Sequence, residues 1–64
     1  MKIKKGDYIR SPRFLNVRIT EVYPSVEALE EAGFRETTHF QDPDYEVYGR
    51  SIGMNRMEFA AGKK

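Results

Sequence analysis

The sequence predicts a small α+β domain, with a bent antiparallel sheet or partial barrel of four to five strands and one short helix at about residues 25–32. Several segments alternate apolar and polar residues with a period of two, which is typical of half-buried strands. Gly, Pro and Asp residues separate these segments at short intervals and indicate tight turns. A single segment has the N-cap, the apolar spacing and the glycine stop of a helix.

Length and composition limit the size of the core. The chain has 64 residues, of which 39% are hydrophobic and 33% charged, and it contains no cysteine. We expect one domain, residues 1–64, of marginal stability, because so short a chain buries only about 60% of its unfolded surface. The lack of cysteine excludes disulfides and thiolate zinc sites. No apolar run of signal-peptide or transmembrane length occurs in the sequence, which favours a cytoplasmic bacterial or phage protein.

The clearest strand pattern lies at residues 14–23. Leu15, Val17 and Ile19 alternate with polar residues, so all three are expected on the buried face. The alternation slips after Thr20, and a β-bulge at residues 20–21 would restore it and bend the sheet.

The helix is expected to follow this strand directly. Ser25 is a suitable N-cap, and Gly33 is a suitable residue to end the helix. Leu29 is the predicted anchor of a narrow apolar stripe that packs on the sheet. Phe34 can fold back onto the last helical turn as the apolar contact of a Schellman-type end.

Two further strands, at residues 45–52 and 56–61, follow a strong turn signal at residues 41–44. A turn of three to four residues between them would place Gly49 opposite Phe59, where a glycine leaves room for an aromatic ring. Residues 37–40 also have the character of a short strand. Residues 62–64 are expected to fray as a C-terminal tail.

The first strand is expected to end near Arg10, and the residues that lead into it carry a resemblance. Lys5-Gly6-Asp7-Tyr8-Ile9 resembles the opening strand of SH3-like barrels, in which Gly-Asp precedes a hydrophobic strand, and this implies that the partial barrel is SH3-like. The whole chain resembles small uncharacterised proteins of bacterial mobile elements and phages, in its Phe-Leu-Asn-Val strand and its Asn-Arg-Met-Glu-Phe-Ala-Ala ending. The second resemblance implies an origin and no particular function.

Charge is distributed unevenly along the chain, although the net charge is only +1. Residues 1–20 hold six basic residues and one acidic residue, residues 21–46 hold one basic and eight acidic residues, and residues 47–64 hold four basic residues and one acidic residue. If the two ends of the chain meet, one side of the molecule is basic and the opposite side acidic. Internal charge balance is the alternative interpretation of the same pattern.

The sequence holds no complete motif for catalysis, metal binding or cofactor binding. His39 could act with Asp42 and Asp44 as a base or a metal-ligand set, but two of these three are common turn residues and no further ligand is evident. The glycines are scattered rather than gathered in a phosphate-binding loop, and no serine lies in a Gly-x-Ser-x-Gly context. We therefore expect no enzyme, no metal site and no cofactor.

The candidate binding residues are arginines and aromatic side chains. Two arginines flank Ser11-Pro12 ahead of an aromatic residue, and they could contact phosphates while a ring stacks on a base. The alternative is that these arginines pair with the acidic helix. The tyrosines could line a groove for an extended peptide or simply fill the core. The candidates are Tyr8, Arg10, Arg13, Phe14, Arg18, Tyr45, Tyr48 and Arg50.

The function predicted from these features is that of a small non-enzymatic binding module. A protein partner, or a second copy joined through an exposed edge strand, is expected first. Nucleic acid is the alternative partner, although a dedicated nucleic-acid binder of this size usually has a clearly positive net charge. The acidic stretch at residues 21–46 could also occupy a basic groove of another protein. Neither a membrane nor a small-molecule substrate is expected.

Overall fold

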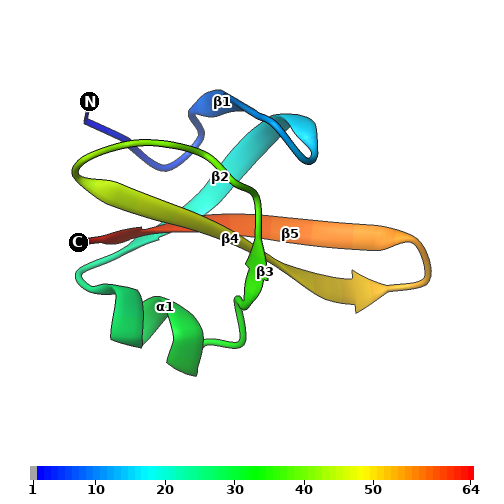
Figure 1. Cartoon of the computed structure of the whole chain (residues 1–64). Helices are drawn as coiled ribbons and strands as arrows, with labels where there is room; N and C mark the ends of the chain where they lie inside the picture. The colour runs from blue at the N-terminus through cyan, green and yellow to red at the C-terminus, as the bar shows by residue number, and fades with distance from the viewer. Residues whose placement is uncertain (1) are drawn as a thin grey trace.

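Five strands and one helix form a half-barrel in the computed structural model, which describes residues 2–64 (Figure 1). The elements are β1 (Tyr8–Ser11), β2 (Leu15–Tyr23), α1 (Val26–Glu31), β3 (Glu36–Thr37), β4 (Tyr45–Gly53) and β5 (Arg56–Lys63). The strands lie in the order β1-β2-β5-β4-β3 within one sheet. The predicted α+β class, with a partial barrel and one short helix, is confirmed.

One strand pair differs from the antiparallel arrangement expected from the sequence. β2 runs parallel to β5, whereas the other three neighbouring pairs are antiparallel, so the sheet is mixed. Parallel neighbours require a long connection between them. Here α1, β3 and β4 all lie along the chain between β2 and β5, which places the last strand at the centre of the sheet.

The predicted bulge in β2 is confirmed. Ile19 lies opposite Phe59 and Val22 opposite Ala61, so β2 advances by three residues where β5 advances by two. Within the bulge, the Thr20 hydroxyl donates a hydrogen bond to the Phe59 carbonyl at 3.0 Å. The bulge bends β2 across the sheet and helps to curve it.

Leu15 does not join the core, and here the prediction from the alternation is wrong. Its φ is 64° and its side chain is 61% exposed. The Ser11 hydroxyl accepts the Phe14 N–H at 3.1 Å and donates to the Leu15 carbonyl at 3.3 Å, which fixes a tight turn. Because this turn uses the first residues of the alternating segment, burial begins only at Val17.

Apolar side chains pack on both faces of the sheet. Ala60 and Ala61 are adjacent in β5 and therefore point to opposite faces, and both are fully buried. The cluster around Ala61 contains Ile3, Ile9, Val17, Ile19, Tyr45 and Val47. The cluster around Ala60 lies under α1 and contains Leu29 and Phe34, with Tyr23, Ala32 and Tyr48 at its margin.

The ends of α1 form as the sequence predicts. The Ser25 hydroxyl accepts the Ala28 N–H at 3.0 Å and caps the first turn. Gly33 has a φ of 97°, and the N–H groups of Gly33 and Phe34 donate to the carbonyls of Glu30 and Leu29, which is a Schellman motif. Leu29 is fully buried and is the anchor of the helix, as expected. The N-cap and the Schellman end thus define a helix too short to persist alone in water.

The hairpin of β4 and β5 places Gly49 opposite Phe59, and this prediction is confirmed. A Cβ atom at Gly49 would lie 2.8 Å from Phe59 Cε1 and 2.9 Å from Met57 Cε, so the glycine is required by close approach. The turn has two residues instead of the expected three to four, because Gly53 pairs with Arg56, and a register shift of one residue between Ser51 and Gly53 restores the expected pairing of Gly49. A second bulge therefore lies just before the turn.

The C-terminal residues and β3 differ from what the sequence predicts. Residues 62–64 were expected to fray, but Gly62 and Lys63 belong to β5, and Lys64 donates its backbone N–H to the Asp44 carbonyl at 2.8 Å. β3 contains only two residues instead of the expected four. Beyond it, the Thr38 hydroxyl donates to the Val47 carbonyl at 2.8 Å, so a side chain takes the place of a further ladder bond.

The carboxylate of Asp42 organises the turn that leads into β4. Its Oδ2 accepts the backbone N–H of Asp44 at 2.9 Å and that of Tyr45 at 3.0 Å. The hydrogen bond from Asp44 makes the largest contribution to lowering the pKa of Asp42 below its ordinary value of 3.8. The folded protein therefore favours the ionised form of this side chain.

Asp42 is expected to make stability depend on pH in the acid range. Because its pKa is lower in the folded state, its stabilising effect is complete above the unfolded pKa and is lost as the pH falls through the folded one. Asp42→Asn keeps an acceptor oxygen without the charge, so it should be less stable than the wild type at neutral pH. The difference should narrow toward about pH 2. Thermal melts of both proteins between neutral pH and about pH 2 measure this difference in stability. A difference that does not change with pH would contradict the prediction.

None of residues 2–64 lies in a helix long and apolar enough to span a membrane.

Candidate functional site

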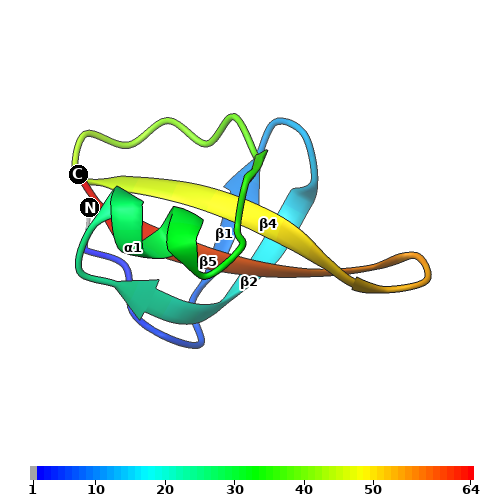
Figure 2. The ribbon, with the colours of Figure 1, turned by 90° about the horizontal axis from the view of Figure 1, so that it is seen from below.

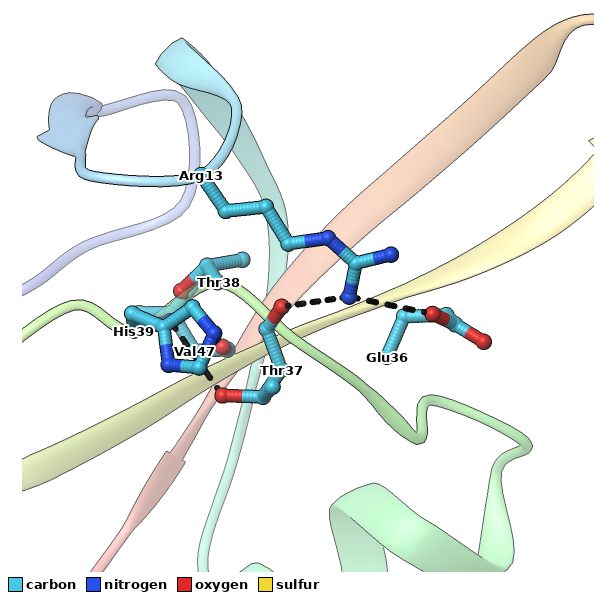
Figure 3. A network of polar contacts seen from close by, with 6 residues as sticks. All are labelled: Arg13, Glu36, Thr37, Thr38, His39 and Val47. Atoms are coloured by element: carbon cyan, nitrogen blue, oxygen red, sulfur yellow. Dashed lines mark hydrogen bonds and ion pairs between the residues drawn. The ribbon is translucent and has the colours of Figure 1, made fainter.

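Arg13 joins the β1–β2 turn to β3 and is held in place by the fold (Figure 3). Its Nη1 lies 3.2 Å from Glu36 Oε1 and donates to the Thr37 carbonyl, also at 3.2 Å. Its backbone N–H donates to the Thr38 carbonyl at 3.3 Å. These contacts connect two distant parts of the half-barrel. Arg13 therefore has an acidic partner, as one interpretation of the sequence proposed, but this partner lies on β3 and not on the helix.

Phe14 follows Arg13 and belongs to the wall of the core. Its ring meets the Phe59 ring edge to face, with the centroids 5.0 Å apart. The Arg13 guanidinium lies 4.8 Å from the centroid of the Phe14 ring. With one edge against the core and a guanidinium over the ring, Phe14 is poorly placed to stack on a base.

Arg50 ties the end of α1 to the sheet. Its Nη2 lies 2.8 Å from Glu58 Oε1, and its Nη1 donates to the Ala32 carbonyl at the C-terminus of the helix. The guanidinium also lies over the Phe34 ring, 4.3 Å from its centroid. A cation at this position compensates the free carbonyls of the helix end. Arg50 is therefore a structural residue in this fold.

The tyrosines do not form a shared groove. Tyr45 is only 8% exposed and packs in the cluster around Ala61, whereas Tyr23 and Tyr48 lie at the margin of the cluster under α1. Burial, followed by the negative charges of Glu46 and Glu30, raises the pKa of the Tyr48 hydroxyl above its ordinary value. These three tyrosines therefore lie in the core and at its rim, as the alternative interpretation of the sequence proposed.

Three of the predicted residues, Tyr8, Arg10 and Arg18, remain exposed and lie together; we call them the β1–β2 face. Tyr8 lies opposite Arg18, and Ile9 lies opposite Val17. Since Ile9 and Val17 are buried, the alternation of β-strands places the other three on the outer side. Tyr8 is 73% exposed, and neither arginine forms an ion pair with any residue from 2 to 64.

The tip of the β4–β5 hairpin, residues 51–56, is a surface that the sequence interpretation did not include. All six residues are exposed, and the tip contains Ile52 and Met54, which are 50% and 88% exposed. Figures 1 and 2 both show the hairpin projecting beyond the rest of the molecule. The position of Met54 in a turn was a usable signal, because a large apolar residue in a tight turn has little to pack against.

His39 does not come together with carboxylates in a ligand set. It is exposed, has a φ of 59°, and donates its backbone N–H to the Thr37 hydroxyl at 3.2 Å. Asp42 directs its Oδ2 to two backbone N–H groups of its own turn. In the part of the chain that the structure describes, no three His, Asp or Glu side chains are grouped so that they could hold a metal ion.

A shallow depression of about 400 Å³ lies near the start of β4 and is lined by Lys2, Asp44, Tyr45 and Lys63. Its walls combine basic and acidic groups. It provides no apolar enclosure of the kind that small-molecule sites usually have. No protein-family model, curated protein or solved structure matches this chain, so the assignment of a function rests on the surfaces described above.

Proposed function

We propose that this protein is a small non-enzymatic module that binds a partner protein through the tip of the β4–β5 hairpin. The observation that supports the proposal is the exposure of two large apolar side chains, Ile52 and Met54, on a projecting turn. Full burial of such a side chain contributes about 1.5–3 kcal/mol. Single exposed apolar residues are common on protein surfaces, but two at the end of one projecting hairpin form a compact anchor.

The backbone at the tip supports the same role. The bulge between Ser51 and Gly53 leaves Ile52 without a partner in the ladder, and bulges commonly redirect a side chain. β3 pairs with β4 only at Tyr48 and Gly49, so on the edge of β4 that faces away from β5 no described strand lies beside residues 50–53. An extended segment of a partner can add to such an edge by main-chain hydrogen bonds.

Charge favours a different protein over a second copy as the partner. Arg56 is the only charged residue in the tip and is exposed. Two tips that met across a two-fold axis would bring two Arg56 side chains together, which is unfavourable. A groove with apolar walls and an acidic rim complements both the apolar anchors and Arg56.

A photo-crosslinking experiment followed by affinity measurement tests the proposal. A photoreactive phenylalanine at position 54 should crosslink one protein in the cells that encode this chain, and one at the exposed helical position 31 should not. With that protein purified, we expect Ile52→Ser/Met54→Ser to bind at least about tenfold more weakly than the wild type by calorimetry. Leu15→Ser, which alters an apolar side chain of similar exposure away from the tip, is the matched control and should bind normally.

Two outcomes would contradict this proposal. Equal affinity of the wild type and the tip variant would remove the hairpin from the interface. If instead the wild type is dimeric in sedimentation and the tip variant monomeric, the partner at the tip is a second copy. Because the substituted side chains are exposed, thermal melts of the variants should match the wild type and verify that they fold.

A further inference from the structure

The β1–β2 face combines an exposed aromatic ring with two arginines that form no ion pair within residues 2–64. Tyr8 and Arg18 are directly opposite in the antiparallel ladder, where Cβ atoms lie about 4.5–5.5 Å apart. Arg10 lies two residues from Tyr8 on the same side of β1, a rise of about 7 Å. The ring is therefore flanked by guanidinium groups along the strand and across it.

Two further basic residues and one acidic residue lie in the chain just before this face. Lys4 and Lys5 lie in the turn that enters β1, are exposed, and form no ion pair with other described residues. Asp7 is the one acidic residue in this part of the chain, and its Oδ2 accepts the backbone N–H of Lys4 at 2.8 Å. The β1–β2 face and the turn before it thus present four positive charges, one negative charge and one exposed aromatic ring.

Three of the exposed acidic residues lie on the other side of the molecule (Figure 1). α1 carries Glu27, Glu30 and Glu31, all exposed. In Figures 1 and 2, α1 and β1 lie on opposite sides of the β4–β5 ribbon. The separation of charge therefore orients the β1–β2 face toward a polyanion and α1 away from it.

We propose that the β1–β2 face binds single-stranded nucleic acid, with Tyr8 stacking on a base and Arg10, Arg18, Lys4 and Lys5 contacting phosphates. Stacking on an exposed ring requires an unstacked base, which single strands provide and duplexes do not. The six-residue α1 lies away from this face, so no helix is available there to enter a major groove. The exposed ring favours nucleic acid over an acidic protein segment, which the arginines alone would attract equally well. This proposal is independent of the role of the hairpin tip.

Fluorescence anisotropy with labelled oligo(dT), oligo(U) and a duplex tests the proposal between low and physiological salt. Four phosphate contacts predict a slope of log affinity against log salt of about −3 for a single strand. Tyr8→Ala should weaken single-strand binding about fivefold to a hundredfold without changing this slope, whereas Tyr8→Phe should bind normally. Arg10→Ala/Arg18→Ala should make the slope shallower by about 1.4.

Arg35→Ala is the matched control for charge, because it removes one exposed arginine that follows α1. It should leave affinity and slope unchanged. The tip variant Ile52→Ser/Met54→Ser should also bind the oligonucleotide normally, which separates the outcome at this face from the outcome at the hairpin.

Three results would overturn the proposal. The first is no binding of any oligonucleotide at low salt. The second is a loss of affinity in Arg35→Ala that equals, per arginine removed, the loss in Arg10→Ala/Arg18→Ala, which would indicate attraction by charge without a site. The third is no effect of Tyr8→Ala together with equally strong binding of polyglutamate, which would make an acidic protein segment the ligand.

Discussion

Leu29→Ala is expected to lower the free energy of unfolding by about 2–4 kcal/mol. Leu29 is fully buried and anchors α1 on the sheet, so its truncation removes apolar burial and leaves a cavity beside Phe34 and Ala60. A domain of this size has a total stability of only about 3–10 kcal/mol. Denaturant titration measures the loss, and the melting temperature should fall by roughly 10–30 °C.

The matched control for this substitution is Leu15→Ala. It removes the same atoms from a side chain that is 61% exposed, so the change should be within about 0.5 kcal/mol. Equal stability of Leu29→Ala and the wild type would show that the helix does not depend on Leu29.

Gly62→Ala is expected to destabilise the fold by about 1–3 kcal/mol through overpacking. A Cβ atom at this position would lie 2.9 Å from the Ser25 carbonyl oxygen and 3.0 Å from both Cβ and Cδ2 of Leu29. The oxygen belongs to the backbone at the N-cap, so relief of the clash requires movement of the whole first turn of α1. Denaturant titration of the single variant measures this cost.

The two substitutions are expected to be coupled, since they act on the same contact. Leu29→Ala removes Cδ2 and relieves part of the clash caused by Gly62→Ala. The double variant should therefore lose less stability than the two single losses together, by an interaction energy of at least about 0.5 kcal/mol. Strict additivity would mean that the contact between Gly62 and Leu29 does not limit the packing of the helix.

Features defined by neighbours in sequence were predictable. Ser25, Gly33 and Phe34 mark the ends of α1 because capping and the Schellman motif involve residues within one turn of each other. The pairing of Gly49 with Phe59 follows from the two-residue turn together with the bulge next to it, which join the two strands. In each case the physical cause lies within about ten residues of chain.

Features that depend on distant contacts were not predictable in the same way. The parallel pairing of β2 with β5 joins residues about 40 apart, such as Thr20 and Phe59, and nothing near either residue specifies the partner. Similarly, Gly62 is a local signal for fraying, and only its pairing with the distant residues Tyr23 and Glu46, under α1, accounts for an ordered strand there.

The roles of single side chains in the candidate site also depend on distant contacts, which the sequence does not reveal. Arg10 and Arg13 have the same chemistry and lie three residues apart, yet only Arg13 meets Glu36, because closure of the half-barrel brings β3 to the β1–β2 turn. The sequence could gather eight candidates, but it could not separate the arginines with internal partners from those without. Ile52 and Met54 are not among these candidates, because the candidates are arginines and aromatic residues, and the exposure of an apolar side chain depends on how far the hairpin projects from the fold.

The central position of β5 has a consequence for the synthesis of the protein. β5 is the last of the six elements to leave the ribosome, and its final residue, Lys63, follows the end of β2 by 40 residues. At about 5–20 residues per second, β2 is complete roughly 2–8 s before β5. Until β5 has left the ribosome, β2 lacks the strand that joins it to β4, so the emerged chain keeps an apolar strand face in contact with water or with chaperones.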